Sequence, residues 1–303
     1  MGKSSTDNYL RLDEKLLVKP GSKVDLRKFD TKYTADFKDK DDAREMLEQD
    51  VKRLSELQDM LYAYNKYSLL IIFQAMDAAG KDGTIKHVMS GVNPQGCAVT
   101  SFKQPSTEEL EHDYLWRINK ALPRRGMISI FNRSHYEEVI VTRVHPEYIL
   151  YQNIPGINSI DKIDNSFWMK RYESINNFEK HIADNGAVIL KFFLHVSKDE
   201  QKERFLARIE EPEKNWKFSV TDVKERQFWD RYMESYEDAI INTSTRYAPW
   251  YVIPADRKWF MRAAVGDIIV GTLEQLNISY PEISEVEKAE LNKAKDIIFK
   301  EDN

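Results

Sequence analysis

The sequence predicts an α/β protein in which a parallel five-stranded sheet lies between two layers of helices. Five short apolar runs indicate buried strands, and they lie at residues 68–73, 97–102, 127–131, 187–196 and 250–253. Segments with helical periodicity separate these runs along the chain. Strands that are apolar on both faces and alternate with helices are typical of a parallel sheet covered on both sides. We therefore expect a three-layer αβα sandwich.

The composition is that of an ordinary globular protein. Its 303 residues, 42% of them hydrophobic, are enough for a sizeable core. The formal net charge of -5 excludes a general attraction to nucleic acid or to an anionic membrane surface. The single cysteine, Cys97, can form neither an internal disulfide nor a thiolate metal site, and no apolar stretch is long enough to span a bilayer. We expect a soluble protein of the reducing cytoplasm that binds neither nucleic acid nor membranes.

The first 40 residues are predicted to form an irregular N-terminal arm outside the main domain, which we place at 41–280. They are polar and contain the turn signal Pro20-Gly21. From residue 41 to residue 65, apolar side chains recur at steps of three and four, which indicates an amphipathic helix. These side chains are Met46, Val51, Leu54, Leu57, Leu61 and Tyr64. This helix leads into the first predicted strand.

The later helices are predicted from capping signals and periodicity. Ser106 with Glu109, and Ser197 with Glu200, each fit a capping box, so that helices should begin near residues 107 and 198. Long helical patterns cover residues 162–183, 221–241 and 256–275, and a charged helix covers 285–300. The last of these lies in a C-terminal segment, 281–303, that we place outside the main domain.

A helical lid is predicted at about 205–225, where a proline and several polar residues interrupt two helical patterns. Arg204 and Arg208 lie four residues apart on one face of the helix beside the lid, and Lys214 and Lys217 lie within it. Closure of such a lid would bring cations over bound phosphates and exclude water. The alternative for each of these side chains is a solvated helix face.

The stretch QAMDAAGKDGT, residues 74–84, resembles a phosphate-binding loop of the Walker A type. The usual pattern is G-x-x-x-x-G-K-[ST], but Ala75 stands at the first glycine and Asp82 at the hydroxyl residue. A helix should begin just after Gly80, so that its first N–H groups can receive phosphate oxygens, and Lys81 adds a positive charge. The other residues expected to contact substrate here are Ala78, Ala79, Gly83 and Thr84. The alternative is a structural turn that binds no anion.

Two carboxylates, Asp77 and Asp82, lie beside this supposed anion site. They would repel a phosphate unless a cation lay between them, and Mg²⁺ is the cation that prefers carboxylate, water and phosphate oxygens. We therefore expect both aspartates to be metal ligands. Asp82 could instead be a first-turn aspartate favoured by the helix dipole, and Asp77 could orient or deprotonate the attacking oxygen.

The segment FNRSHYEE, residues 131–138, follows the third predicted strand. In kinases with such loops this position usually carries an acidic metal ligand, but here it is Asn132. Arg133 comes next and should face the ligand crevice, where its planar fork can bind phosphate oxygens; a surface salt bridge is the alternative. Glu137 could be a helix-start charge, or it could contact the acceptor nucleotide or a metal.

Five motifs in order resemble the polyphosphate kinase 2 family, over about residues 8 to 275. They are QAMDAAGKDGT, SFKQPSTEEL, DYLWR, IFNRSHYEEV and RYESINNFE. The resemblance implies a thymidylate-kinase-like P-loop fold with a helical lid, and reversible, Mg²⁺-dependent transfer of the terminal phosphoryl group of inorganic polyphosphate to AMP or ADP. Adenine and guanine nucleotides are the expected partners besides polyphosphate. We also expect a homo-oligomer, either a dimer or a tetramer.

By position, the resemblance assigns Asp77, Lys81, Asp82 and Arg133 to the catalytic core. It assigns Arg208 to the lid, and we add Asn132, Glu137 and Lys217 as substrate contacts. Family members restricted to ADP often carry a different third motif, and the departure at Asn132 and Glu137 resembles the members that accept AMP. One rival hypothesis is a nucleotide kinase of the same fold that uses a nucleoside triphosphate as donor. Another is a P-loop switch that binds nucleotide without catalysis.

Overall fold

The computed structural model describes residues 12–301 and contains one six-stranded sheet in the order β1-β6-β5-β2-β4-β3. The strands are β1 (Leu17–Val18), β2 (Ser68–Ala75), β3 (Cys97–Ser101), β4 (Ile128–Asn132), β5 (Ala187–His195) and β6 (Trp250–Pro254). Strands β2 to β6 run parallel to one another, so the five predicted strands are confirmed. Their carboxyl ends meet at one edge, where ligands bind in open α/β sheets. The prediction that all five are buried was wrong for β3, because this strand lies at the edge of the sheet and its residues are exposed or half-buried.

The predicted N-terminal arm is more ordered than expected. It contains α1 (Leu12–Leu16), β1 and a short 3₁₀ helix, η1 (Leu26–Lys28). Strand β1 pairs antiparallel with β6, so the prediction of a purely parallel sheet of five strands was wrong. A strand of two residues is too short for a periodic pattern to reveal it. Residues 1–11 of the predicted arm and 302–303 of the predicted C-terminal segment lie outside the described residues.

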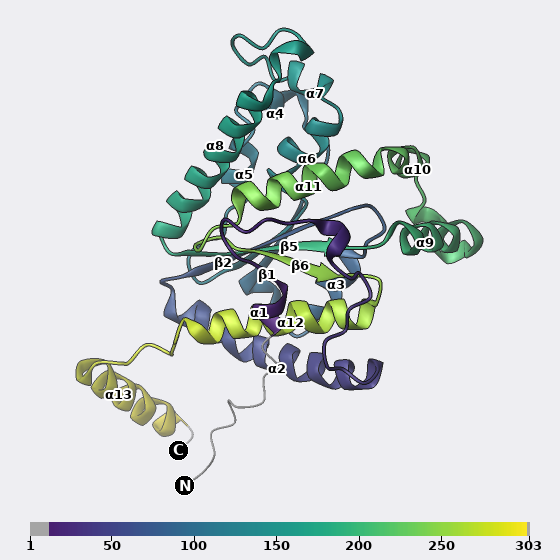
Figure 1. Cartoon of the computed structure of the whole chain (residues 1–303). Coiled ribbons are helices and arrows are strands. Elements are labelled where there is room, and N and C mark those ends of the chain that lie inside the picture. Colours follow the sequence, from purple (N-terminus) through teal and green to yellow (C-terminus); the bar gives the residue numbers. More distant parts are fainter. Residues whose placement is uncertain (1–11, 302–303) are drawn as a thin grey trace.

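Helices cover both faces of the sheet, which confirms the three-layer sandwich (Figure 1). One layer contains α1, α2 (Lys40–Tyr64), α3 (Lys81–Val88) and α12 (Lys258–Gln275). The other contains α6 (Glu137–Val144), α8 (Asn165–Asp184) and α11 (Trp229–Thr243). Helix α2 begins where the Asp39 carboxylate accepts two backbone N–H groups, and it ends at Asn65 in the left-handed conformation, as capping chemistry favours.

The remaining helices lie around this sandwich. They are α4 (Thr107–Leu110), α5 (Trp116–Lys120), α7 (Glu147–Leu150), α9 (Lys198–Glu210), α10 (Val220–Glu225) and α13 (Glu285–Glu301). Both predicted capped starts, near 107 and 198, are confirmed by hydrogen bonds at the caps. The helix predicted over 221–241 is instead divided into α10, a 3₁₀ turn and α11. Helix α13 stands apart from the sandwich (Figure 1).

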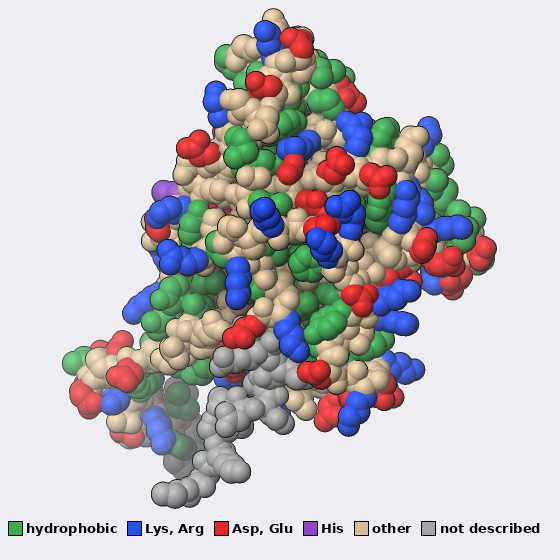
Figure 2. All heavy atoms as spheres, in the orientation of Figure 1, with side chains coloured by type: hydrophobic (Ala, Val, Ile, Leu, Met, Phe, Trp, Pro, Cys, Tyr) green, Lys and Arg blue, Asp and Glu red, His purple; other side chains and the backbone are tan. Residues whose placement is uncertain are grey.

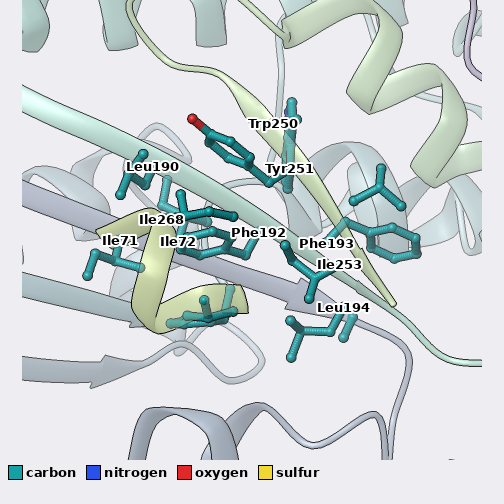
Figure 3. Packing of buried hydrophobic residues seen from close by; sticks show 14 of the residues in the cluster. Ile71, Ile72, Leu190, Phe192, Phe193, Leu194, Trp250, Tyr251, Ile253 and Ile268 are labelled. Atoms are coloured by element: carbon teal, nitrogen blue, oxygen red, sulfur yellow. The ribbon is translucent and has the colours of Figure 1, made fainter. Parts of the chain in front are cut away.

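The core is formed where β2, β5 and β6 pack against the helices (Figure 3). Ile71, Phe192 and Ile253 are fully buried on central strands, which explains the continuous apolar runs in the sequence. The exception is Lys191 in β5, whose side chain is also fully buried. Its Nζ donates to Glu179 Oε2 at 2.6 Å and to two further oxygen atoms, so that this charge is both paired and hydrogen-bonded.

The visible surface carries both signs of charge in mixed order (Figure 2). Neither positive nor negative side chains dominate this face of the molecule, in agreement with the small net charge of -5. Within residues 12–301, none of the helices combines the length and the apolar character that crossing a bilayer would need.

Candidate active site

The phosphate-binding loop connects β2 to α3 at the carboxyl edge of the sheet. Helix α3 begins at Lys81, directly after Gly80, which confirms the predicted start. Gly80 has φ +114 and no side chain caps the helix, so the first N–H groups of α3 have no partner within the helix. Ala75 still belongs to β2, which explains why a glycine is not needed at that position. The loop therefore presents an open helix N-terminus of the kind that binds anions.

Asp77 and Arg133 meet because β2 and β4 are parallel neighbours. Arg133 Nη2 lies 2.9 Å from Asp77 Oδ1, and its Nη1 lies 3.9 Å from Glu137 Oε2. Arg133 has φ +63, an uncommon conformation for a side-chain-bearing residue, and its N–H donates to the carbonyl of Phe73 at 3.0 Å. The guanidinium is thus held inside the site between two carboxylates.

A second contact joins the end of β4 to the first turn of α3. Asn132 Nδ2 donates to Asp82 Oδ1 at 2.6 Å, so the amide that replaces the usual acid orients a carboxylate of the loop. Lys81 Nζ donates to the carbonyl of Ala75 at 3.1 Å, beneath the loop. Thr84 is buried, and its hydroxyl donates to the carbonyl of Gly80 at 3.1 Å. The four predicted catalytic residues, together with Asn132 and Glu137, therefore lie at one place.

The charges of this site influence one another strongly. Burial raises the pKa of Glu137, although the nearby Arg133 and Lys81 oppose the shift. Burial, with the positive charge of Arg133 nearby, lowers the pKa of Lys81. The carboxylate of Glu137 is the main cause that raises the pKa of Arg133, which therefore stays protonated. In such a partly dry setting, charged groups act on a substrate more strongly than they would in water.

The carboxylates of Asp77 and Asp82 have the chemistry that Mg²⁺ requires. Each uses one oxygen for the contact with Arg133 or Asn132, and its second oxygen is left for a ligand. Among the residues that the structure describes, there is no group of three or more His, Cys, Asp or Glu side chains suited to a metal. Mg²⁺ commonly binds one or two carboxylates and takes waters and substrate phosphates as its other ligands. The two aspartates fit that mode of binding.

The predicted lid residues contact each other more than the loop. Arg208 Nη1 donates to the carbonyl of Lys217 at 3.3 Å and lies 3.6 Å from Asp222 Oδ2. Lys217 Nζ lies 4.9 Å from the ring centre of Trp216, whose side chain is 78% exposed. Within the lid, Asp222 lies near the loop, and burial together with the negative charge of Asp77 raises its pKa.

Arg204 differs from the expectation that it faces phosphates. Its guanidinium donates instead to backbone carbonyls of the loop, those of Ala78 and Ala79. One turn earlier, Gln201 Nε2 donates to the carbonyl of Asp77 at 2.9 Å. The sequence contained only one sign of this arrangement, an i, i+4 pair with Glu200 that would hold the arginine against its own helix.

Two further cations were missed by sequence reasoning. Lys258 and Arg262 lie one turn apart at the start of α12. Burial is the main cause that lowers the pKa of each, and the charge of Arg204 adds to it. Arg262 also lies beside the first turn of α3, since a Cβ at Gly83 would be 3.6 Å from its Nη2. In the sequence these residues are a lysine and an arginine four positions apart at the start of a predicted helix. Such a pair is also common on solvated helix faces, so it did not by itself indicate a site.

A buried polar network supports the start of α6, where Glu137 lies. Glu138 Oε2 accepts hydrogen bonds from Gln152 at 2.6 Å and from Arg171 at 3.3 Å. Arg117 Nη2 lies 3.8 Å from the other oxygen of Glu138. Arg117 and Arg171 belong to two of the motifs found in the sequence, and these contacts give them a shared place in the structure.

Comparison with known proteins gave consistent matches over most of the chain. A family model described as Polyphosphate kinase 2 matches residues 37–281. An "ADP-polyphosphate phosphotransferase" of Rhodopseudomonas palustris is 54% identical, over 90% of this chain and 94% of that protein. An "AMP/ADP-polyphosphate phosphotransferase" of Meiothermus ruber is 47% identical, over 89% of this chain and 96% of that protein.

A solved structure is also similar along nearly its whole length. The crystal structure of Polyphosphate Kinase 2 from Arthrobacter aurescens has a TM-score of 0.83 and 39% identity with this chain. The match covers 93% of this chain and 96% of that one.

Proposed function

The chain belongs to the polyphosphate kinase 2 family, and we propose on that premise that this site transfers the terminal phosphoryl group of inorganic polyphosphate to AMP or ADP, reversibly. One observation carries the assignment to these residues. The open N-terminus of α3 lies next to Arg133, which is held between Asp77 and Glu137. An anion site beside a positioned guanidinium is what phosphoryl transfer needs, since its catalysis is mostly positioning and electrostatic stabilisation.

Each group of the site has a separate role in the transfer. The first N–H groups of α3 and the ammonium of Lys81 bind the terminal phosphates of the donor. A phosphate oxygen of the acceptor nucleotide attacks the terminal phosphorus in line, and the bond to the bridging oxygen of the chain breaks. Arg133 uses the N–H groups not bonded to Asp77 to stabilise negative charge on the group in transfer. The shortened polyphosphate leaves with the electron pair of that bond.

We propose Mg²⁺ as the metal. When bound by Asp77 and Asp82 together with phosphate oxygens, it would neutralise charge on donor and acceptor. The orientation of Asp82 by Asn132 supports this assignment, because a fixed carboxylate binds a metal with less loss of conformational freedom. Asp77 could serve as a base or orienting group as well. Removal of divalent metal with EDTA should abolish turnover, and added Mg²⁺ should restore it.

Further cations near the loop support the donor proposal. Lys258 at the start of α12 lies close enough to Arg204, Lys214 and Arg262 for their positive charges to help lower its pKa, although burial is the main cause. Apart from Arg204, which bonds to the loop, these cations could together with Arg208 and Lys217 follow a linear polyanion for several phosphates. A nucleoside triphosphate has only three phosphates and a base, so it would use fewer of these cations. Polyphosphate binding should weaken as salt concentration rises.

For the acceptor, we propose that AMP is phosphorylated as well as ADP. The support is the sequence at Asn132 and Glu137, which departs from the pattern of members restricted to ADP. The matched relative of Meiothermus ruber is named for both AMP and ADP, whereas that of Rhodopseudomonas palustris is named for ADP. Guanine nucleotides are a further proposed acceptor. Failure to form ADP from AMP and polyphosphate would contradict the proposal for AMP.

The test of the proposed function compares donors directly. Purified protein is incubated with ADP, Mg²⁺ and either polyphosphate or GTP, and ATP is measured by luciferase. We expect ATP with polyphosphate and little with GTP; the reverse result would support the rival kinase that uses nucleoside triphosphates. Nucleotide binding without any turnover would support the P-loop switch.

Two broader proposals accompany the enzyme assignment. We propose a homo-oligomer, a dimer or a tetramer, and light scattering coupled to size-exclusion chromatography measures this directly. We also propose a cytoplasmic location, supported by the single cysteine, Cys97, which needs no oxidising compartment. Fractionation of the source cells would test it.

A further inference from the structure

Helix α9 binds three consecutive carbonyl groups of the phosphate-binding loop. Gln201 Nε2 donates to the carbonyl of Asp77 at 2.9 Å. Arg204 Nη1 donates to the carbonyl of Ala78 at 3.0 Å and to that of Ala79 at 2.5 Å. All three carbonyls are therefore turned toward α9, the helix that leads into the lid.

The direction of these carbonyls determines the direction of the next N–H groups. In a trans peptide the C=O and N–H point to opposite sides of the chain. The N–H groups of Ala78, Ala79 and Gly80 thus point away from α9. That of Ala79 bonds to the carbonyl of Met76 at 3.2 Å. Those of Ala78 and Gly80 extend the series of donors that the start of α3 provides.

The backbone would not keep this arrangement by itself. Ala78 has φ +62, a left-handed conformation that a residue with a side chain seldom adopts without support from its surroundings. Gly80, two residues later, also has positive φ. Hydrogen bonds from a rigid side chain are the kind of contact that can hold such a loop in one conformation.

The rest of the Arg204 side chain is bonded elsewhere. Its Nη2 donates to the carbonyl of Ala255 at 2.6 Å, and its Nε donates to Glu200 Oε1 at 2.8 Å. The residue is only 8% exposed. Arg204 therefore joins three pieces of the site: helix α9, the phosphate-binding loop and the connection between β6 and α12. To contact a phosphate, its guanidinium would first have to leave these carbonyls.

We propose that Arg204 is a positioning residue, which turns the peptide planes of residues 77–80 so that the loop N–H groups face the phosphate. It acts through the loop and does not touch the substrate. The expected loss of activity in Arg204 variants rests on the proposed function, whereas the expected change in loop conformation does not. It also implies that the moving part of the lid begins after Arg204, since the first two turns of α9 are fixed to the loop.

A lysine at position 204 should not take over the function of Arg204. A guanidinium presents several N–H groups in a flat fork and can bond to carbonyls of two separate segments, whereas an ammonium is a single compact charge. A direct phosphate contact, in contrast, is served by either charge. Because small misplacement of groups in phosphoryl transfer costs up to about 10²-fold in rate, we expect Arg204→Lys and Arg204→Gln both to lose about 10²-fold in kcat/KM for polyphosphate.

The experiment compares these variants with Arg208→Lys and Arg208→Gln, one turn later on the same helix. For each, kcat, KM for polyphosphate and KM for ADP are measured at several salt concentrations. A lost phosphate contact lowers the slope of log affinity against log salt by roughly 0.7 to 0.9. We expect the Arg204→Gln slope to equal that of the wild type and the Arg208→Gln slope to be lower. Lys202→Gln, an exposed change on α9, should leave all values unchanged.

Amide hydrogen exchange adds a readout that does not depend on activity. In Arg204→Gln, exchange at residues 78–84 should rise at least about tenfold while β5 stays protected. Gln201→Ala should show the same change to a smaller degree, and it serves if Arg204→Gln does not fold. Wild-type exchange in both variants, full activity of Arg204→Lys, or a reduced salt slope in Arg204→Gln would each overturn the proposal. A wild type without polyphosphate turnover would refute the proposed function alone, because the exchange result would still decide the role of Arg204.

Discussion

Arg133→Ala is the substitution whose outcome the structure determines most clearly. The guanidinium lies 2.9 Å from Asp77 Oδ1 beside the anion site, and its side chain is 40% exposed. An arginine that stabilises transferring phosphoryl charge contributes about 10³- to 10⁵-fold to the rate. At about 1.4 kcal/mol for each factor of ten, that loss corresponds to about 4 to 7 kcal/mol in transition-state energy.

The same substitution should have little effect on stability. A partly exposed ion pair contributes at most about 1 kcal/mol, so the free energy of unfolding should change by no more than that. The assay is ATP formation from ADP and polyphosphate, with urea unfolding of the same preparation. Arg125→Ala, at an exposed arginine in the loop before β4, is the matched control and should keep full activity. Near-normal turnover by folded Arg133→Ala would remove this residue from the mechanism.

Three further predictions concern the loop and the buried charges. Gly80→Ala should cost about 1 to 3 kcal/mol and most of the activity, because φ is +114 and a Cβ would lie 3.1 Å from a methionine side chain; full activity would contradict this. Lys191→Met removes the buried ammonium that pairs with Glu179 and leaves that carboxylate with the Tyr136 hydroxyl and His135 as its partners. Urea unfolding should therefore show a loss of about 3 to 5 kcal/mol, and adding Glu179→Leu should recover part of it. Burial raises the pKa of Asp50 to about 8. Between about pH 4 and 8 the folded state therefore binds one more proton than the unfolded state, and the stability that this proton contributes is lost as pH rises. Asp50→Asn should therefore raise the melting temperature more at pH 8 than at pH 5, and an equal effect at both would refute the buried-acid interpretation.

Much of the fold could be predicted because burial on both faces leaves a clear signal in sequence. The central strand β2 is buried at every position, and continuous apolar runs identified the five parallel strands. Strand β3 was found by the same signal although it lies at the edge of the sheet and is not buried. Strand β1 left no such signal, since a pair of residues has no period. The interruption between α10 and α11 was missed because polar and apolar residues keep a helical spacing through it. The spacing of apolar residues does not show at which turn packing will change an α-helix into a 3₁₀ helix.

The candidate site, too, could be predicted from the sequence only in part. The meeting of Asp77 and Arg133 could be expected, because residues at the carboxyl ends of parallel strands share one edge. The contact between Asn132 and Asp82 depends on the register of β2 against β4, which the sequence does not state. Arg204 could not be placed, since an arginine on a lid helix can reach a phosphate or a carbonyl equally well. Only the positions of the loop carbonyls decide between the two.

The central claim is that a phosphoryl group passes directly from polyphosphate to a nucleotide at the site formed by Lys81 and Arg133. The most direct measurement uses polyphosphate labelled with ³²P, unlabelled ADP and Mg²⁺, with no nucleoside triphosphate added. We predict that the label appears in the terminal phosphate of ATP with the wild-type protein and that Arg133→Ala loses this transfer. Label released only as inorganic phosphate, or no label in ATP with active preparations of the wild type, would contradict the claim.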